Sequence, residues 1–192
     1  MNVYDFDHTI YCGDSSVDFM FFHFGKHPLL WIFFPLQLLI GAAIRLRLCP
    51  VGKGKEWFFA FLRIKPATRR EVKAFWQTHV LKVSTWYLEH KQDTDCVISA
   101  SPDFLLRPLV DECWHLRLIA TLMFPDSGRI SGRNCKGEEK TSRFKKCCRN
   151  ARVDKFFSDS LSDTPMAKMA EHAFLIKFKR DGRSEIRDWP DL

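Results

Sequence analysis

The sequence predicts an α/β fold in which a mostly parallel sheet is interrupted by an inserted helical segment. Short apolar runs at residues 95–99, 118–124, 153–157 and 173–178 have the composition of strands, and helical patterns separate several of them. Residues 3–7 form a further run, which mixes β-forming residues with two aspartates. Strands that alternate with helices indicate a parallel, Rossmann-like sheet. Roughly 80 residues that look entirely helical follow the first run, and because a crossover connection needs only about a dozen residues, they indicate an insertion.

The composition is that of one folded unit with a substantial core. The chain has 192 residues, of which 46% are hydrophobic and 28% charged, so wholesale disorder and a long repeat array are both excluded. A net charge of +7 favours an anionic partner, such as nucleic acid, an acidic membrane surface or a phosphorylated substrate. The seven cysteines include no CxxC pair and no Cys/His spacing typical of a zinc site, which indicates reduced thiols in the cytosol. The first residues lack the pattern of a cleavable secretory signal.

Local signals place further elements along the chain. A Thr-x-x-Glu capping box begins at Thr68, and apolar residues at helical spacing predict one amphipathic helix from there to about His90. Ser101 followed by Pro102 is the pattern of a helix N-cap and first helical residue, so the second strand is expected to turn directly into a helix. Residues 124–129 have the composition of a hairpin tip.

Polar residues follow three of the predicted strands. Asp5 and Asp7 lie two residues apart where the first strand ends, Ser99 closes the second strand, and Asp159 follows a later one. Ligands of parallel sheets bind at the carboxyl ends of the strands, so we expect these side chains around one crevice. Two carboxylates and the backbone between them can surround a divalent cation and a phosphoryl group, and a further loop carboxylate completes an oxygen site for Mg²⁺. Lys140, at the start of a predicted helix, places an ammonium where it can meet a bound anion.

These segments, taken in order, resemble the four motifs of the haloacid dehalogenase superfamily of phosphohydrolases, and the resemblance covers essentially the whole chain. The matching segments are Asp5-Phe6-Asp7-His8-Thr9, Ser99, Lys140 and Asp159-Ser160-Leu161-Ser162-Asp163. The resemblance implies a catalytic core formed by residues 1–14 and 91–192 and a helical cap formed by residues 15–90. It also implies a Mg²⁺-dependent phosphatase that works through an aspartyl-phosphate intermediate.

The roles of the site residues follow from the same resemblance. Asp5 resembles the nucleophile, and Asp7 resembles the general acid that protonates the leaving group and then activates water. Ser99 and Lys140 resemble the pair that holds the phosphoryl oxygens. The Mg²⁺ ligands of the family correspond to three groups, with Asp163 behind them: the Asp5 carboxylate, the Asp7 backbone carbonyl and Asp159.

Five further positions complete or qualify the comparison. Thr9 is similar to the residue that shapes the loop after the first strand, and it is assigned to substrate binding together with Ser99, Ala100 and Asp14. Asp14 occupies the position where soluble relatives carry an acidic residue facing the substrate, and it also has the pattern of a helix N-cap. Lys136 lies near the same helix start as Lys140 and is its alternative. Ser158 stands where the family usually has a glycine, which affects the tightness of that turn.

An apolar segment distinguishes this sequence from soluble relatives. Residues 29–44 include Gln37 as the only conventionally polar residue, whereas a surface helix normally has a polar face. At about 1.5 Å per residue the segment reaches about 24 Å, short of the ~30 Å hydrocarbon core of a bilayer. Basic residues that follow it suit a segment whose end meets anionic lipid headgroups: Arg45, Arg47, Lys53 and Lys55. The alternative is a helix buried within the cap or in a dimer interface.

The apolar, basic cap resembles that of the haloacid-dehalogenase-type phosphatidylglycerophosphate phosphatases of bacteria. This resemblance implies a lipid phosphate substrate and a peripheral or monotopic position on the cytoplasmic side of a membrane. The alternatives are a soluble cytoplasmic phosphatase for a small metabolite such as phosphoserine, and a catalytically idle membrane or interaction module with the same fold. A basic run from Arg143 to Lys155 has no accompanying nucleic-acid motif, so we expect no nucleic-acid partner.

Overall fold

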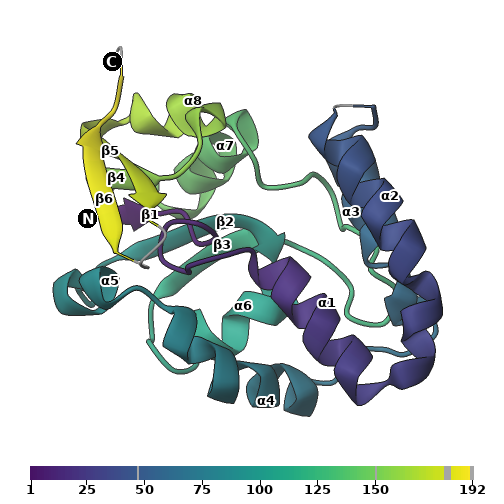
Figure 1. Ribbon diagram of the computed structural model, residues 1–192. Helices are drawn as coiled ribbons and strands as arrows, with labels where there is room; N and C mark the ends of the chain where they lie inside the picture. Colours follow the sequence, from purple (N-terminus) through teal and green to yellow (C-terminus); the bar gives the residue numbers. More distant parts are fainter. Residues whose placement is uncertain (47, 150, 180–182, 191–192) are drawn as a thin grey trace.

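Six strands form one sheet, in the order β3-β2-β1-β4-β5-β6 (Figure 1). The computed structural model describes residues 1–46, 48–149, 151–179 and 183–190. Neighbouring strands pair in parallel, except for the antiparallel pair β5 and β6, so the predicted α/β fold class is confirmed. The strands are β1 (Val3–Tyr4), β2 (Cys96–Pro102), β3 (Arg117–Thr121), β4 (Val153–Ser158), β5 (Ala170–Phe178) and β6 (Ser184–Asp188).

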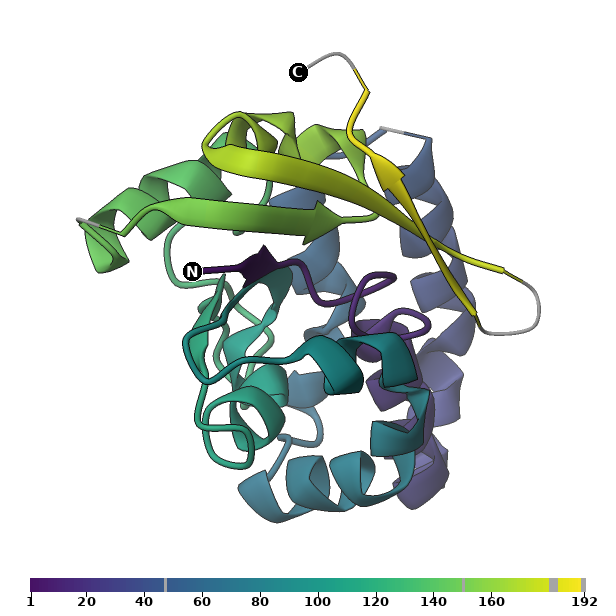
Figure 2. The same cartoon turned by 90° about the vertical axis from the view of Figure 1, so that its left-hand side faces the viewer.

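Both faces of the sheet are covered, because successive strand residues point to opposite sides and both sets are apolar. Tyr4 of β1 stacks on Phe157 of β4 and belongs to the core cluster that includes the apolar residues of α6. Val3 and Phe156, their chain neighbours, belong to the second cluster, with the apolar residues of α7 and α8. Figures 1 and 2 show these helices on the two sides of the sheet. Their bounds are α6 (Asp103–Val110), α7 (Glu138–Cys147) and α8 (Thr164–Ala167).

The described residues between β1 and β2 are helical apart from connecting loops and isolated bridges, as expected of the insertion. These elements lie beside and below the sheet in Figure 1. The division into a core of residues 1–14 and 91–192 and a cap of residues 15–90 stays a prediction. The helices are α1 (Ser15–Lys26), η1 (Pro28–Phe33), α2 (Phe34–Arg45), α3 (Val51–Phe58), η2 (Ala60–Arg63), α4 (Arg69–His79), η3 (Val80–Lys82) and α5 (Thr85–His90).

The single long helix predicted from Thr68 to His90 is wrong in its second half. The capping box is present, since Thr68 accepts a hydrogen bond from the Glu71 amide and the Glu71 carboxylate accepts one from the Thr68 amide. The helix nevertheless ends at His79, and the chain passes through η3 before α5 begins. The break has a tertiary cause, because the Ser84 amide donates to the carbonyl oxygen of Ile10 at 2.8 Å instead of continuing the helix.

Two other boundary predictions need correction. Ser101 is not a helix N-cap: β2 continues to Pro102, which itself precedes the first residue of α6. The reason is that the Ser101 hydroxyl donates to Asp7 across the site. Strand β6 was not predicted, because this exposed edge strand has Ile186 as its single apolar residue and thus no clear alternation. The predicted hairpin tip at residues 124–129 is confirmed by a hydrogen bond that joins its two ends.

The apolar segment, residues 29–44, forms most of η1 and α2 at one side of the molecule (Figure 1). Gln37 and Ile40 face inward, and the Gln37 side chain donates to the carbonyl oxygen of Phe58. Leu30 is also buried, whereas six other apolar side chains are exposed to solvent, so the segment is only partly buried within the cap: Leu29, Trp31, Ile32, Leu36, Leu38 and Leu39. No helix among the described residues has both the length and the hydrophobicity to cross a membrane. Arg47, predicted to contact lipid headgroups, lies outside the described residues.

Candidate active site

One pocket of about 560 Å³ lies at the carboxyl ends of the central strands. The parallel order places β1 between β2 and β4, so residues that follow these strands meet although they are far apart in the sequence. The start of α7 supplies the lysine. The predicted site residues that line the pocket are Asp5, Asp7, Asp14, Ser99, Ala100, Lys140, Asp159 and Asp163.

The first part of the site is a buried cluster around Lys140. Its ammonium lies 2.9 Å from Oδ1 of Asp5 and 2.7 Å from Oδ2 of Asp163. Burial alone lowers the pKa of Lys140, but the charges of the two aspartates outweigh it and raise the pKa. Burial raises the pKa of Asp5 to about 7, although the Lys140 ammonium acts in the opposite direction. The cluster therefore holds one fixed positive charge beside the Asp5 carboxylate, at the place where an anion would meet both.

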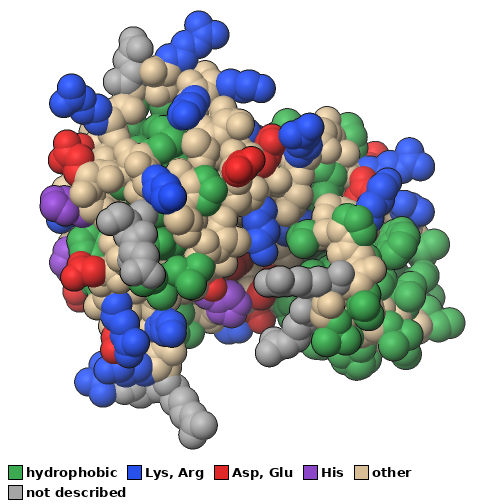
Figure 3. Space-filling view, turned by 90° about the horizontal axis from the view of Figure 1, so that it is seen from above, with side chains coloured by type: hydrophobic (Ala, Val, Ile, Leu, Met, Phe, Trp, Pro, Cys, Tyr) green, Lys and Arg blue, Asp and Glu red, His purple; other side chains and the backbone are tan. Residues whose placement is uncertain are grey.

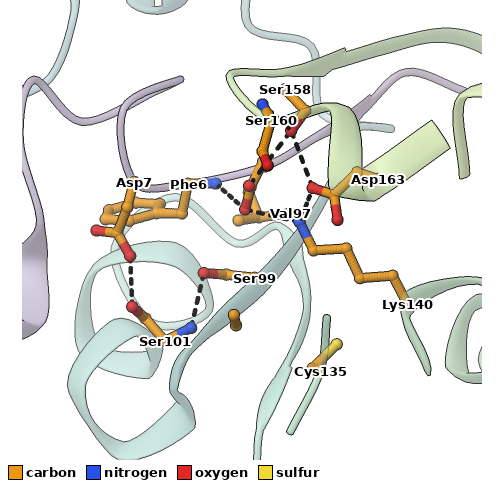
Figure 4. Close-up of polar contacts among 12 residues, drawn as sticks. Phe6, Asp7, Val97, Ser99, Ser101, Cys135, Lys140, Ser158, Ser160 and Asp163 are labelled. Carbon is orange, nitrogen blue, oxygen red and sulfur yellow. Dashed lines mark hydrogen bonds and ion pairs between the residues drawn. The ribbon is translucent and has the colours of Figure 1, made fainter. Parts of the chain in front are cut away.

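Ser158 contributes to the same cluster. Its hydroxyl donates to Oδ2 of Asp163 at 2.9 Å (Figure 4). The same hydroxyl lies 3.5 Å from Oδ2 of Asp5. Among the described non-glycine residues, positive φ angles occur at His8 and His115 and not at Ser158, so the turn after β4 does not need the glycine usual in the family. Serine therefore fits the backbone here and adds a hydrogen bond.

The second part of the site holds Asp7. Oδ1 of Asp7 accepts from the Ser15 amide at 2.7 Å, and Oδ2 accepts from the hydroxyl of Ser101 (Figure 4). Burial and the nearby charge of Asp14 raise the pKa of Asp7 to about 6, while the hydrogen bonds from Ser101 and Ser15 act in the opposite direction. A positioned carboxyl with a pKa this close to neutrality is suited to give and take a proton.

Ser101 is a site residue that the sequence analysis assigned to helix capping. Its amide also donates to Oγ of Ser99 at 3.0 Å, so the two serines and Asp7 form one chain of hydrogen bonds. The spacing of Ser99 and Ser101 could have predicted this role, because residues two apart in a strand point to the same side of the sheet. If β2 is extended through Ser101, both hydroxyls fall on the side of the site.

Lys55 is the second residue missed. It lies in α3, lines the pocket, and its ammonium donates to the carbonyl oxygen of Ala100 at 2.7 Å. Burial lowers its pKa, with the charges of Asp14 and Asp7 acting in the opposite direction. The prediction that Lys55 lies beside Lys53 on the surface that meets a membrane is therefore corrected, since Lys55 is directed into the pocket whereas the Lys53 side chain is 70% exposed. The sequence could have indicated this difference, because residues two apart in a helix, such as Lys53 and Lys55, point in different directions.

Of the remaining predicted positions, some line the pocket and one does not. Asp14 is the N-cap of α1, where Oδ1 accepts from the amides of Ser16 and Val17, and it also lines the pocket. Lys136 is exposed at the pocket rim, whereas Lys140 contacts Asp5. Thr9 is completely buried and does not line the pocket, so the structure gives its hydroxyl no route to a substrate.

The donor set suits a hard divalent cation. Asp5, Asp7 and Asp159 all line the pocket, so carboxylate oxygens from the ends of two strands are available to a cation. Burial raises the pKa of Asp159, as it does for Asp5. Buried carboxylates facing one pocket are destabilised by mutual repulsion, and an added cation relieves this repulsion. The residues therefore fit Mg²⁺ or a similar oxygen-preferring ion such as Mn²⁺.

Solved structures of other proteins share the fold of this chain. A Bordetella pertussis Tohama I protein of unknown function has a TM-score of 0.74 at 17% identity, over 90% of this chain and 87% of that chain. A substrate-bound phosphoserine phosphatase has a TM-score of 0.61 at 14% identity, over 89% of this chain and 82% of that chain. A cytosolic 5′-nucleotidase bound to cytidine has a TM-score of 0.53 at 17% identity, over 93% of this chain and 72% of that chain.

Sequence comparison identifies the family. No curated protein matches the sequence at a significant level. The family model described as haloacid dehalogenase-like hydrolase, however, matches residues 3–168, which include every motif residue discussed above. The chain belongs to the haloacid dehalogenase-like hydrolase family.

Proposed function

We propose that the protein is a Mg²⁺-dependent phosphomonoester hydrolase that removes a terminal phosphate from a lipid at a membrane surface, with phosphatidylglycerophosphate as the leading substrate. The observation that supports the chemistry is the convergence of Asp5, Asp7 and Lys140 in one pocket. The observation that supports the lipid substrate is that α2 both lines this pocket and exposes apolar side chains to solvent.

The reaction has two steps. In the first, an Oδ atom of Asp5 forms a bond to phosphorus while the bond between phosphorus and the ester oxygen breaks, and Asp7 gives its proton to the leaving alkoxide. In the second, Asp7 takes a proton from water as the water oxygen attacks the phosphorus of the aspartyl phosphate, which releases inorganic phosphate and restores Asp5. Ser101 positions Asp7 through its hydrogen bond in both steps.

Charge neutralisation accompanies both steps. The Lys140 ammonium, fixed by Asp5 and Asp163, lies where it can bind the phosphoryl oxygens together with the Ser99 hydroxyl. Asp5, the Asp7 carbonyl and Asp159 would hold the divalent cation, which when bound supplies further positive charge to the phosphoryl group.

The wall of the pocket provides the link to a lipid. Gly41 and Ile44 of α2 line the pocket, and Phe58 at the end of α3 lines it as well. The outer face of the same segment is apolar, and Figure 3 shows a continuous hydrophobic area with basic side chains beside it. The exposed apolar side chains of this region are Leu29, Trp31, Ile32, Leu36, Leu38 and Leu39. Apolar patches this extensive on a soluble surface mark an interaction site.

A bilayer surface fits this face better than another occupant does. The face is continuous with the pocket, so a lipid whose tails stay in the bilayer can place its phosphate near Asp5 without leaving the membrane. Helix α2 has 12 residues, about 18 Å at the usual rise, which suits shallow insertion rather than a span. The exposed Lys53 ammonium is close in sequence to the apolar face and has the charge to meet anionic headgroups. Inside the pocket, Lys55 offers a cation for the diester phosphate of the same substrate.

A second candidate is a phosphatase for a small zwitterionic metabolite such as phosphoserine. The observation in its favour is that Asp14 and Lys55 both line the pocket, so a carboxylate and an ammonium are available for a substrate amino group and carboxylate. The structural similarity to a phosphoserine phosphatase is consistent with this candidate.

Phosphate release decides between the two. Purified protein is assayed with Mg²⁺ on phosphatidylglycerophosphate in mixed micelles and on phosphoserine, with Asp5→Asn as the blank. A preference for the lipid supports the main proposal, and a preference for phosphoserine supports the second candidate. Activity equal to the blank on a broad panel of phosphomonoesters overturns both.

Vesicle binding tests the docking face separately. The variant Ile32→Glu/Leu39→Glu is compared with Leu81→Glu, whose leucine is more exposed than either of these residues but lies in η3, away from α2 in the sequence. Cosedimentation with anionic vesicles is expected for wild type and Leu81→Glu and to be lost in the double variant. Equal binding of all three contradicts the membrane assignment, and a concentration-dependent dimer that only the double variant abolishes identifies a second copy as the occupant instead.

A further inference from the structure

Three metal-ligating side chains meet outside the active site. His23 and His27 lie one turn apart near the end of α1, and Glu71 lies in the first turn of α4. One ligand atom from each lies within 4.8 Å of the other two. Nε2 of His27 is 2.5 Å from Oε1 of Glu71, and Nδ1 of His23 is 4.0 Å from the same oxygen.

The hydrogen bond of His23 Nε2 leaves Nδ1 of the same ring free to bind a cation. The His23 side chain is completely buried, and Nε2 lies 3.0 Å from the carbonyl oxygen of Lys65. A carbonyl oxygen only accepts, so Nε2 carries the proton and Nδ1 presents a lone pair. Nδ1 is buried and has no hydrogen-bond partner among the described residues, and its distance to Glu71 is too long for a hydrogen bond. Metal-bound histidines commonly have this arrangement, with the second nitrogen bonded to a backbone carbonyl.

Hydrogen bonds also orient the Glu71 carboxylate through one of its two oxygens. Its Oε2 accepts from the Thr68 amide at 3.0 Å and from the Thr68 hydroxyl at 2.8 Å, within the capping box. These bonds fix the carboxylate and leave Oε1 directed at the two histidines. The unpartnered atom is His23 Nδ1, because Oε1 of Glu71 accepts a hydrogen bond from His27 Nε2. A buried acceptor without a donor is unfavourable, and a cation bound by all three ligand atoms would satisfy it.

We propose that His23, His27 and Glu71 form a binding site for Zn²⁺ or a chemically similar transition-metal ion. Two imidazoles and one carboxylate match the ligands that zinc prefers, whereas the active-site pocket offers oxygen ligands. Ligand atoms around tetrahedral zinc are about 3.3 Å apart, given bonds of about 2.0 Å. The observed 2.5 Å and 4.0 Å separations lie on either side of this value, and the two histidine nitrogens lie within 4.8 Å of each other, so side-chain adjustments bring the three ligands to the ion. The side chains of His27 and Glu71 are partly exposed, which leaves an entry path and room for a water as fourth ligand.

The bound ion would join the end of α1 to the start of α4. Helix α1 begins at Ser15, and its N-cap Asp14 lines the active-site pocket, so an ion at the far end of the helix fixes the orientation of an element that borders the site. The site itself is independent of the proposed reaction, and its test does not use activity.

Metal binding to the purified full-length chain tests the proposal. Zn²⁺ is titrated calorimetrically into chelator-treated protein in excess Mg²⁺, which occupies the oxygen ligands. Wild type is expected to bind one Zn²⁺ at this site, and His27→Gln and Glu71→Gln are each expected to lose at least tenfold in affinity. Glutamine at position 71 is compatible with the capping box, so helix α4 keeps its start. His79→Gln, in the last turn of α4, is the matched control and is expected to bind as wild type does.

Two further measurements distinguish zinc bound at this site from zinc bound by exposed thiols. The exposed thiols of Cys113 and Cys147 can bind zinc, so all titrations are repeated in a Cys113→Ser/Cys147→Ser background. Zn²⁺ is also expected to raise the Tm of wild type and His79→Gln but not that of His27→Gln. Wild-type affinity in either ligand variant, or no zinc binding by the wild type, overturns the proposal.

Discussion

Replacing Gly128 with alanine should destabilise the protein strongly, and the structure gives the magnitude. Gly128 lies in the hairpin tip at residues 124–129 and has φ of +67°. A left-handed conformation costs a residue with a Cβ about 1–2 kcal/mol. A Cβ here would also lie 2.4 Å from the carbonyl oxygen of Phe59, and overpacking of this kind costs about 1–3 kcal/mol more. The expected loss is therefore about 2–5 kcal/mol, or a fall in Tm of roughly 4–20 °C for a chain of this length.

Gly132 provides the matched control. It also has a positive φ, +88°, but a Cβ there would meet nothing within 4 Å. Gly132→Ala should therefore show the conformational part of the effect alone, about 1–2 kcal/mol. Urea unfolding of the two variants measures the difference, which isolates the contact between the hairpin and the backbone at Phe59. Equal losses in the two variants would refute the steric argument.

Three further predictions concern the lysines of the site and the start of α4. Because burial lowers the pKa of Lys55, its charge is lost at a lower pH than that of an ordinary lysine, so KM for a substrate with a second anionic group should rise at alkaline pH. In Lys55→Arg the guanidinium stays charged and KM should stay flat; identical KM profiles over this pH range would contradict a substrate contact. Asp163→Asn removes the shorter ion pair of Lys140 and should lower the unfolding free energy by about 1.5–3 kcal/mol in urea, whereas no change would mean that Asp5 alone satisfies the buried ammonium. Thr68→Ala removes the capping box and should lower the unfolding free energy by about 1 kcal/mol, with Thr68→Ser close to wild type; equal losses would show that the cap hydroxyl is not the cause.

The parallel strands of the sheet and the acidic part of the site were predictable because their signals are local. Asp5 and Asp7 break the apolar pattern of a strand that must be buried, and a parallel sheet places such residues at one edge. A lysine near the helix start was predictable as well, and the contact with Asp5 identifies it as Lys140 rather than Lys136. The start of α4 was predictable for the same reason, since a capping box depends on side chains three residues apart.

The features that were missed depend on contacts between distant segments. The end of α4 is set by the loop after β1, because the Ser84 amide bonds to Ile10. The role of Ser101 requires Asp7 opposite it, and that of Lys55 requires Ala100. The His23 and His27 spacing is visible in the sequence, but Glu71 joins it only through the packing of α1 against α4. Periodicity and capping rules contain no information about such partners.

The position of β1 has a consequence for how the protein folds. The strand that precedes Asp5 has two residues, and its hydrogen bonds require Cys96 on one side and Phe156 on the other. Contacts between segments this far apart form slowly, because long loops must close before any pairing stabilises them. During synthesis, β1 therefore gains both of its partners, and the surroundings of Asp5 are assembled, only after β4 has emerged from the ribosome.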